Sequence, residues 1–508
     1  MRPSAVVLRR RSFLRGAALT AAALPFAFRR TARAAGLGPL VPDPDGILDL
    51  PAGFSYTILD RRGDPMSDGY RVPGLPDAMG AFAGPGGAVI LMRNHEVGLL
   101  DPINGAYAAG EAPPEAYDAA GMGGVTRLVI DPATLTVQSS NLVLTGTIRN
   151  CAGGVSPWGW LSCEETVDGI HGYTFLCPLD AERVAPAQRI AGYGRYNHEA
   201  ACVDPATSIA YLTEDRGDGC LYRFVPDSPA DPFTGTLQAL RVKGAPMFAT
   251  TGMTVGQRVD VEWVDIDEPT PVTDTVRVEA QDKGAALVVR GEGIWFDAGA
   301  VYVCSTSGGP ASAGQIFRLL DAPGAATLEL LARSEDTAVL DRPDNITVAP
   351  WGELFMAEDG GGGDNYIRVL DETGAVYDFA RNVFSGSEMA GVCFSPDGRI
   401  LFVNLQKDGM TLAITGPFPQ VEPASDTTGG DTGGDTGGDT GGDTGESPTT
   451  GEPPADGSTS DASTDDGDAT SAGTSDDAAG CNCDATADTS PALQLVAAAA
   501  LLHAARSR

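Results

Sequence analysis

Six stretches of the chain repeat one pattern of polar and apolar positions. Each begins with a polar or acidic residue and crosses a short apolar segment, and most then turn through Pro with Gly or Asp. A second apolar segment follows and leads to a polar end. The six stretches are Asp77–Glu96, Asn150–Glu165, His198–Asp215, Glu292–Ser307, Asp344–Asp359 and Glu388–Gln406. Short apolar runs bounded by turn residues indicate strands, so each stretch predicts a β-hairpin.

The repetition of these hairpins predicts an all-β fold, a β-propeller spanning residues 35–420. We expect six blades, one for each hairpin, with seven as the alternative if a divergent repeat escapes notice. The 65 Gly and 36 Pro fit many short strands joined by tight turns. Helical periodicity is scarce outside the two ends of the chain.

The geometry of a hairpin then predicts a functional site. The first and last residues of an antiparallel hairpin lie at the same end. If these hairpins are the inner strands of the blades, their polar ends converge on one mouth of the central channel. That mouth would gather Asn94, His95, Glu96, Cys163, Glu164, Glu165, His198, Glu199, Glu214, Asp215, Glu292, Asp344, Asn345, Glu358 and Asp359. Neighbouring carboxylates disfavour one another's charge, so we expect several bound cations there. The alternative is that each acid simply faces solvent from a loop.

The distribution of charge agrees with cation binding. The formal net charge is −34; residues 1–34 contribute +8 from eight Arg, residues 421–480 contribute −15, and residues 481–508 cancel. Residues 35–420 therefore carry −27, which excludes nucleic acid as a partner because phosphate backbones need basic patches. Hard cations are the natural counter-charge, although an acidic exported surface gives the same composition.

The ligand types narrow the choice of metal. Carboxylates suit calcium, whereas His and thiolate suit a transition metal. Apart from the pair Cys481 and Cys483, the chain has seven Cys, and an odd number in an exported body leaves one thiol free or used as a ligand. We predict that Cys163, beside Glu164 and Glu165, is that ligand. The alternative is that Cys163 is a buried hydrophobic residue.

Two arginines stand close to the expected mouth. Arg290 precedes Glu292 by two residues, so both side chains point to the same side of one strand. Arg342 stands directly before Pro343 and Asp344. A guanidinium fork is suited to orienting a substrate phosphate or carboxylate, although either Arg could instead form ordinary ion pairs.

The first 34 residues predict export. The twin-arginine motif, Arg10 to Arg15 (RRSFLR), precedes an apolar run, Ala17–Phe28, and a small-residue site ending at Ala34. We therefore expect a signal peptide for the twin-arginine translocase, with a basic N-terminal helix as the alternative. This route carries proteins that are already folded, often around a cofactor, which favours a metal site.

The last 88 residues predict a spacer and a sorting signal. Residues 421–480 are acidic, contain the Asp-Thr-Gly-Gly repeats of Ser425–Gly445, and have almost nothing to bury, so we expect a disordered linker rather than a loose calcium site. Residues 481–508 combine Cys481 with an apolar run, Pro491–Ala505, and terminal arginines. That run is too short for a comfortable membrane span. The segment resembles the MYXO-CTERM signal, which implies C-terminal sorting machinery and display at the cell surface.

Six motifs together resemble the PhoX-type alkaline phosphatase family across roughly residues 40–415. They are RNHE (93–96), NCAGGVSPWGWLSCEE (150–165), GRYNHEAACVDP (194–205), YLTEDRGDGCLYRF (211–224), RGEGIWF (290–296) and FSPDGRILFVNLQ (394–406). The resemblance implies an exported six-bladed propeller that hydrolyses phosphate monoesters at a cluster of Fe3+ and Ca2+.

Carried over by motif, the resemblance implies roles for particular residues. Arg290 and Glu292 would act in catalysis, and Arg290 would contact the substrate phosphate. Arg342 is predicted to bind the substrate from its position beside the mouth, not from the resemblance. Together with the mouth geometry, the resemblance predicts the metal ligands Glu96, Cys163, Glu164, Glu165, Glu199, Glu292, Asp344 and Glu358.

Three functions follow as hypotheses. The first is a metal-dependent phosphatase acting on small-molecule phosphate esters, a monomer in the periplasm or on the outer cell surface, anchored there if the C-terminal segment is retained. The second is a calcium-dependent propeller hydrolase of lactones or phosphotriesters, without a cysteine ligand. The third is a non-catalytic calcium-binding surface protein. Metal content separates the first from the second, because only the first requires iron.

Overall fold

The computed structural model describes residues 36–360 and 363–420. All of them belong to one compact unit, Met1–Val421. The predicted signal peptide (1–34), linker (421–480) and sorting segment (481–508) lie outside the described residues and stay predictions. Within the described part of the chain, no helix is long and apolar enough to cross a membrane.

The regular structure of the described residues is almost entirely antiparallel β-sheet, which confirms the predicted all-β class. The described helical elements are one short α-helix and three 3-10 turns: α1 (Val276–Asp282), η1 (Pro85–Gly87), η2 (Ala191–Tyr193) and η3 (Thr250–Gly252).

Three of the sheets have four strands each. The first contains β4 (Pro76–Ala83), β5 (Val89–His95), β6 (Gly123–Asp131) and β7 (Thr136–Thr147). The second contains β8 (Asn150–Ser156), β9 (Gly159–Glu164), β10 (Thr174–Cys177) and β11 (Gln188–Ile190). The third contains β25 (Met389–Phe394), β26 (Ile400–Leu405), β27 (Met410–Thr415) and β3 (Ser55–Arg61). The third sheet thus joins an early strand to the last strands and ties the two ends of the domain together.

Two larger sheets complete the fold. The nine-stranded sheet runs in the order β12 (His198–Val203), β13 (Ala210–Glu214), β14 (Leu221–Ser228), β15 (Asp231–Val242), β16 (Arg258–Asp265), β20 (Thr327–Arg333), β19 (Gln315–Leu320), β18 (Ala300–Ser305) and β17 (Gly291–Asp297). The six-stranded sheet runs β1 (Leu40–Val41), β2 (Leu48–Pro51), β24 (Val376–Asn382), β23 (Tyr366–Leu370), β22 (Leu354–Glu358) and β21 (Pro343–Val348). The nine-stranded sheet is two hairpin systems joined at their outer edges by β16 and β20.

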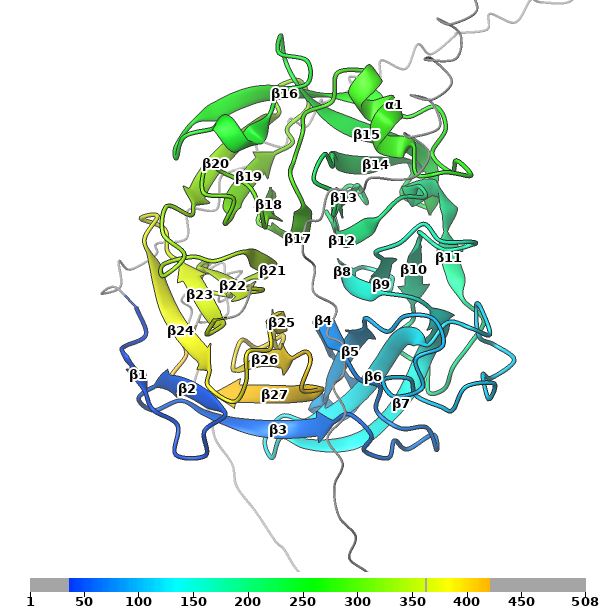
Figure 1. The fold of residues 1–508 in the computed structure, drawn as a ribbon, viewed down its shortest axis with the longest axis vertical. Coiled ribbons are helices and arrows are strands. Elements are labelled where there is room, and N and C mark those ends of the chain that lie inside the picture. The colour runs from blue at the N-terminus through cyan, green and yellow to red at the C-terminus, as the bar shows by residue number, and fades with distance from the viewer. Residues whose placement is uncertain (1–35, 361–362, 421–508) are drawn as a thin grey trace, which may run out of the picture. The chain divides into compact units, whose positions relative to one another are not determined.

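Each predicted hairpin is present as an antiparallel strand pair: β4–β5, β8–β9, β12–β13, β17–β18, β21–β22 and β25–β26. Their first strands lie innermost, as Figure 1 shows, and each contacts the next around the centre until β25 meets β4. The predicted propeller arrangement is therefore confirmed, with the first and last residues of every hairpin at one end of the channel.

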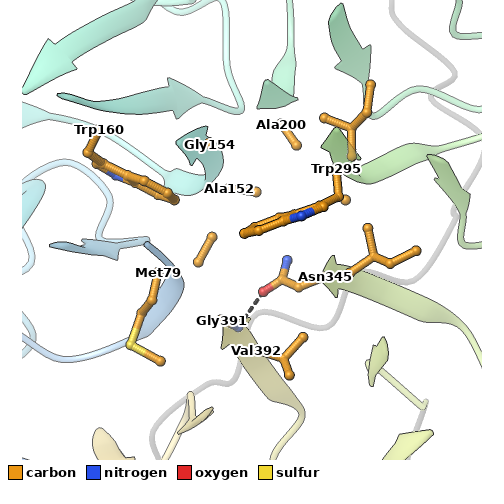
Figure 2. A pocket seen from close by; sticks show the side chains of 14 residues that line it. Met79, Ala152, Gly154, Trp160, Ala200, Trp295, Asn345, Gly391 and Val392 are labelled. Carbon is orange, nitrogen blue, oxygen red and sulfur yellow. Dashed lines mark hydrogen bonds between the residues drawn. The ribbon is translucent and has the colours of Figure 1, made fainter. Parts of the chain in front are cut away.

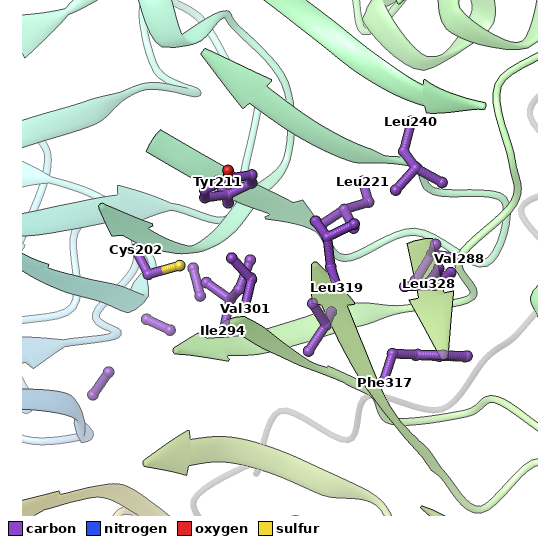
Figure 3. Close-up of a cluster of buried hydrophobic side chains, with 14 of the residues drawn as sticks. Cys202, Tyr211, Leu221, Leu240, Val288, Ile294, Val301, Phe317, Leu319 and Leu328 are labelled. Carbon is purple, nitrogen blue, oxygen red and sulfur yellow. The ribbon is translucent and has the colours of Figure 1, made fainter. Parts of the chain in front are cut away.

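The hydrophobic core lies between neighbouring sheets. Figure 3 shows one such cluster, where Leu221 and Leu240 of β14 and β15 face Phe317 and Leu319 of β19. Nearer the axis, β8 and β12 approach so closely that position 154 has no room for a side chain. A Cβ on Gly154 of β8 would lie 1.6 Å from the carbonyl oxygen of Ala201 in β12.

Candidate metal centre

A β-bulge near the start of each inner strand shapes the channel mouth. In β8, Asn150 pairs with Glu164 and Gly153 pairs with Ser162, so two residues of β8 oppose one residue of β9. A bulge bends its strand and re-aims the side chain at that position. The first residues of the equivalent bulges are Asp77, Cys151, Glu199, Glu292 and Asp344. In β25 the bulge comes one residue later, at Gly391, which has no side chain to offer.

Four of these bulge residues meet in two overlapping sets of potential ligands. The sulfur of Cys151 and one oxygen each of Glu165 and Glu199 lie within 4.8 Å of one another; we call this set the thiol group. One oxygen each of Glu199, Glu292 and Asp344 also lie within 4.8 Å of one another; we call this set the carboxylate group. Glu199 belongs to both, so the two groups are adjacent at the mouth.

The buried acidic side chains of both groups favour binding of a cation. Burial, reinforced by the neighbouring acids, raises the pKa of Glu199 and of Glu292 well above its ordinary value. Burial likewise raises the pKa of Glu165 to about 8 and that of Asp344 to about 8. Burial and the nearby Glu199 raise the pKa of the Cys151 thiol. These side chains would therefore hold protons in a bare site, and a bound cation would displace them.

A further acidic set, the Asp77 group, consists of Asp77, Glu96, Asp359 and Glu388. Burial and the nearby Asp359, Glu96 and Asp77 raise the pKa of Glu388 well above its ordinary value, so the four side chains lie close together. Burial, the charge of Asp344 and the charge of Glu96 raise the pKa of Asp77 well above its ordinary value. The Nε2 atom of Gln406 donates hydrogen bonds to Asp77 Oδ2 at 3.2 Å and to Glu96 Oε2 at 3.0 Å. Asp77 Oδ1 is buried and has no hydrogen-bond partner among the described residues, so it is available to a cation.

Arg290 is clamped onto the carboxylate group. Its Nε and Nη2 donate to the two carboxylate oxygens of Asp215 at 2.8 and 2.9 Å, and Nη2 also donates to Glu292 Oε1 at 2.8 Å. Burial lowers the pKa of Arg290, but Glu292 and Asp215 outweigh that effect and raise it. Arg290 and Glu292 thus point to the same side, as their spacing predicts. The guanidinium of Arg342 makes no hydrogen bond or ion pair with the residues that the structure describes.

The structure places Cys163 away from the channel mouth. Its side chain is fully buried in a hydrophobic cluster with Leu161 and Ile190, and its sulfur lies 3.5 Å from Thr174 Oγ1. Cys163 belongs to neither potential ligand group, because β9 turns this side chain toward the core between two sheets. The thiol at the mouth is Cys151, which stands directly after the first residue of its hairpin, as Glu199 does.

Glu164 also lies outside the centre. Its Oε1 accepts a hydrogen bond from the backbone nitrogen of Ile148 at 3.1 Å and lies 2.5 Å from His171 Nδ1. Its Oε2 accepts from the backbone nitrogen of Gly172 at 2.9 Å. Consecutive residues at a strand end point to opposite sides, so Glu165 faces the mouth while Glu164 anchors the surrounding loops.

Glu358 is the third predicted ligand that the structure places elsewhere. Its Oε1 accepts hydrogen bonds from the backbone nitrogen of Asp341 and from Arg368 Nε, both at 2.8 Å. Asp359, the next residue, belongs to the Asp77 group instead. Of the eight predicted metal ligands, the structure brings Glu165, Glu199, Glu292 and Asp344 into the two potential ligand groups and Glu96 into the Asp77 group.

The two histidines near the mouth form hydrogen bonds within the fold. His95 is buried between Gly74 O and Thr126 Oγ1, each at 2.9 Å from a ring nitrogen. His198 lies 3.1 Å from Gly194 O, and burial lowers its pKa to about 3. Neither ring belongs to the thiol group or the carboxylate group.

The channel narrows directly beneath the bulge residues. Small residues such as Ala152, Ala200 and Gly293 surround a cavity of about 20 Å³, and the ring of Trp295 lies across it, as Figure 2 shows. The side-chain oxygen of Asn345 accepts a hydrogen bond from the backbone nitrogen of Gly391 in the same layer. A space of this size holds about one water molecule, so a ligand must reach the acids from the mouth.

The fold and the site define a β-propeller protein whose channel mouth carries a thiol, buried carboxylates and a clamped arginine, a set suited to cations. The chain belongs to the alkaline phosphatase PhoX family, whose model matches residues 35–141 and 134–409. It is accordingly an enzyme of the alkaline phosphatase type, a phosphoric monoester hydrolase.

Solved structures with a similar fold include Pseudomonas fluorescens PhoX in complex with vanadate, a transition state analogue. That likeness has 17% identity and a TM-score of 0.56, and it covers 73% of this chain and 96% of the other. A gluconolactonase from Xanthomonas campestris has 15% identity and a TM-score of 0.31, with coverages of 70% and 100%. The periplasmic gluconolactonase of Pseudomonas aeruginosa has 14% identity and a TM-score of 0.37, with coverages of 70% and 91%. No curated protein matches the chain by sequence.

Proposed function

We propose that this chain is an exported, metal-dependent phosphatase that hydrolyses small-molecule phosphate monoesters at Fe3+ and Ca2+ ions in the mouth of a six-bladed propeller. The observation that carries the proposal is the pair of ligand groups sharing Glu199. Membership of the PhoX family indicates the reaction. The donor atoms of the two ligand groups indicate which metals bind.

The two groups favour different ions. A thiolate from Cys151 with carboxylates from Glu165 and Glu199 suits a transition metal, so we place iron there. The all-oxygen set of Glu199, Glu292 and Asp344 suits calcium. The Asp77 group, with its unpartnered Oδ1, suits a further calcium ion.

The residues of the chain bind and orient the phosphate group of the substrate. Bound metals supply Lewis acidity toward the phosphoryl oxygens and offset the charge that develops on them. Arg290 donates to the phosphoryl oxygens as a rigid fork, because Asp215 and Glu292 hold its guanidinium in place. Arg342, without an ion pair among the described residues, is the second donor. Trp295 narrows the channel beneath and limits the site to groups that enter from the mouth.

Localisation follows from the predicted segments at the ends of the chain. We propose export by the twin-arginine translocase after metals are loaded in the cytoplasm, followed by sorting through residues 481–508 to the cell surface or release into the periplasm. The propeller itself acts as a monomer in this proposal.

The test combines metal analysis with substrate profiling on protein purified from its export pathway. We expect iron together with calcium in each chain, and faster hydrolysis of p-nitrophenyl phosphate at alkaline pH than of a phosphotriester or a lactone. Calcium without iron, together with lactone or phosphotriester hydrolysis, would support the calcium-dependent hydrolase. Iron- and calcium-loaded protein that is inert on every substrate would support the non-catalytic surface protein.

A further inference from the structure

We propose that Arg149 is a third phosphate-binding arginine and that it makes the site selective for dianionic monoesters. This inference rests on the proposed function and deepens it. Arg149 stands directly before β8, as Arg290 and Arg342 stand directly before β17 and β21.

The three arginines share one backbone arrangement. Each is the residue directly before an inner strand, and each has a left-handed φ: +50° for Arg149, +48° for Arg290 and +51° for Arg342. The carbonyl oxygen of each accepts a hydrogen bond, at 3.0 Å, from the backbone nitrogen of the residue that follows the second strand of its hairpin, namely Glu165, Thr306 and Asp359. Leu75 before β4 has the same arrangement, so the backbone fixes the position at the mouth and the side chain decides what that position can bind.

The side chains of Arg149 and Arg290 contact the acidic groups at the mouth. Arg290 contacts Glu292 of the carboxylate group. Arg149 forms an ion pair with Glu165 of the thiol group, and its Nε lies 3.4 Å from Glu96 Oε1 of the Asp77 group. Arg149 therefore stands over the ligands as Arg290 does, on a different blade.

Arg149 is also the more accessible of these two side chains. Its side chain is 41% exposed, compared with 22% for Arg290, although both are paired with carboxylates. A guanidinium carries five donors, so a fork that contacts a carboxylate on one edge can still donate to an anion on another. An incoming phosphate thus meets Arg149 at the solvent side of the site.

Three guanidinium forks suit a ligand with several charged oxygens. A phosphate monoester presents three non-bridging oxygens and up to two negative charges, whereas a diester presents two such oxygens and one charge. Charge-assisted hydrogen bonds strengthen with the charge of the acceptor, so a third arginine favours the monoester. Arg149 is therefore a specificity-determining residue in this proposal.

The test compares Arg149→Gly and Arg149→Lys with the wild-type protein, all loaded with iron and calcium. Glycine accepts the left-handed backbone, so the first variant removes the side chain without strain. The probe is inorganic phosphate, with its affinity measured by calorimetry and as a competitive inhibition constant. We expect Arg149→Gly to weaken phosphate binding about 10-fold or more, the size of a lost charge-assisted hydrogen bond, and Arg149→Lys to recover part of the loss.

Three further readouts separate binding from a structural role. In Arg149→Gly we expect unchanged metal content, a larger rise in KM than fall in kcat, and a reduced preference for p-nitrophenyl phosphate over bis(p-nitrophenyl) phosphate. The matched control is Arg399→Ala, because Arg399 is 71% exposed at the hairpin turn between β25 and β26, the opposite end from the mouth.

The outcomes distinguish this inference from the function on which it rests. Phosphate affinity within two-fold of wild type in Arg149→Gly, or loss of bound metal in that variant, would overturn the role of Arg149 alone. Wild-type protein that neither binds phosphate nor hydrolyses monoesters would overturn the proposed function and this inference with it.

Discussion

Replacing Cys151 by Ser is the sharpest perturbation of the proposed centre. The thiol is 4% exposed, and its sulfur lies 3.5 Å from His198 O and 3.6 Å from Glu199 O; a serine hydroxyl, on a shorter bond, reaches these acceptors only after a small shift. The fold should therefore tolerate Cys151→Ser with a loss of about 1–2 kcal/mol, as for a buried hydroxyl with weak partners. Iron binding should fall much further, because a thiolate ligand is lost.

A minimum value can be estimated for the loss of iron affinity in Cys151→Ser. Mutating a residue that only supports a metal ligand costs about 10- to 100-fold in affinity, so removing a ligand should cost at least about 100-fold, or about 2.8 kcal/mol. The assay is iron content per chain after dialysis against a weak chelator, followed by denaturant unfolding of the same samples.

Cys163→Ser is the matched control for this experiment. Its thiol is packed among apolar side chains, so a hydroxyl there should lower the free energy of unfolding by about 1–2 kcal/mol while iron content stays at the wild-type level. The reasoning is refuted if Cys163→Ser loses iron and Cys151→Ser keeps it.

Three other predictions address charge, substrate binding and packing. Because the pKa of Glu165 and that of Asp344 are raised to about 8, the folded, metal-free protein holds more protons than the unfolded chain. Its stability should be full below pH about 4 and fall toward pH about 8, by about 1.4 kcal/mol per pH unit for each group, and calorimetry should show that calcium opposes the fall. Arg290→Ala should lower kcat/KM for p-nitrophenyl phosphate by about 10- to 100-fold, with Arg290→Lys intermediate; equal rates in all three proteins would remove Arg290 from substrate binding. Gly154→Ala should destabilise the protein by about 3 kcal/mol in urea unfolding, because its Cβ would collide with Ala201 O; a neutral effect would mean that the inner strands are not packed this closely.

The hairpins could be predicted from the sequence because each depends on a pattern of residues that are close together in the chain. Alternation and turn residues define each strand pair, and antiparallel geometry then brings the polar ends together. The pairing of β3 with β27 and the joining of β16 to β20 could not be predicted in the same way. Both depend on contacts between segments far apart in the chain, which no local pattern records.

Part of the ligand set was predictable from position in the hairpin. Glu199, Glu292 and Asp344 each stand at or next to the start of their hairpin, so convergence at the mouth was enough to select them. Cys151 occupies the same position in its hairpin as Glu199, but Cys163 was preferred as the thiol ligand because it stands beside two carboxylates in the sequence. For the pair Glu164 and Glu165, only the register shows which carboxylate faces the mouth.

Anomalous diffraction at the iron edge, from crystals of protein purified with its native metals, tests the central claim most directly. We predict a strong iron peak bounded by the Cys151 sulfur and the carboxylates of Glu165 and Glu199. We also predict a site without iron signal, refined as calcium, among Glu199, Glu292 and Asp344. Density for a metal bound to Cys163, or no metal at either group in active enzyme, would contradict the account.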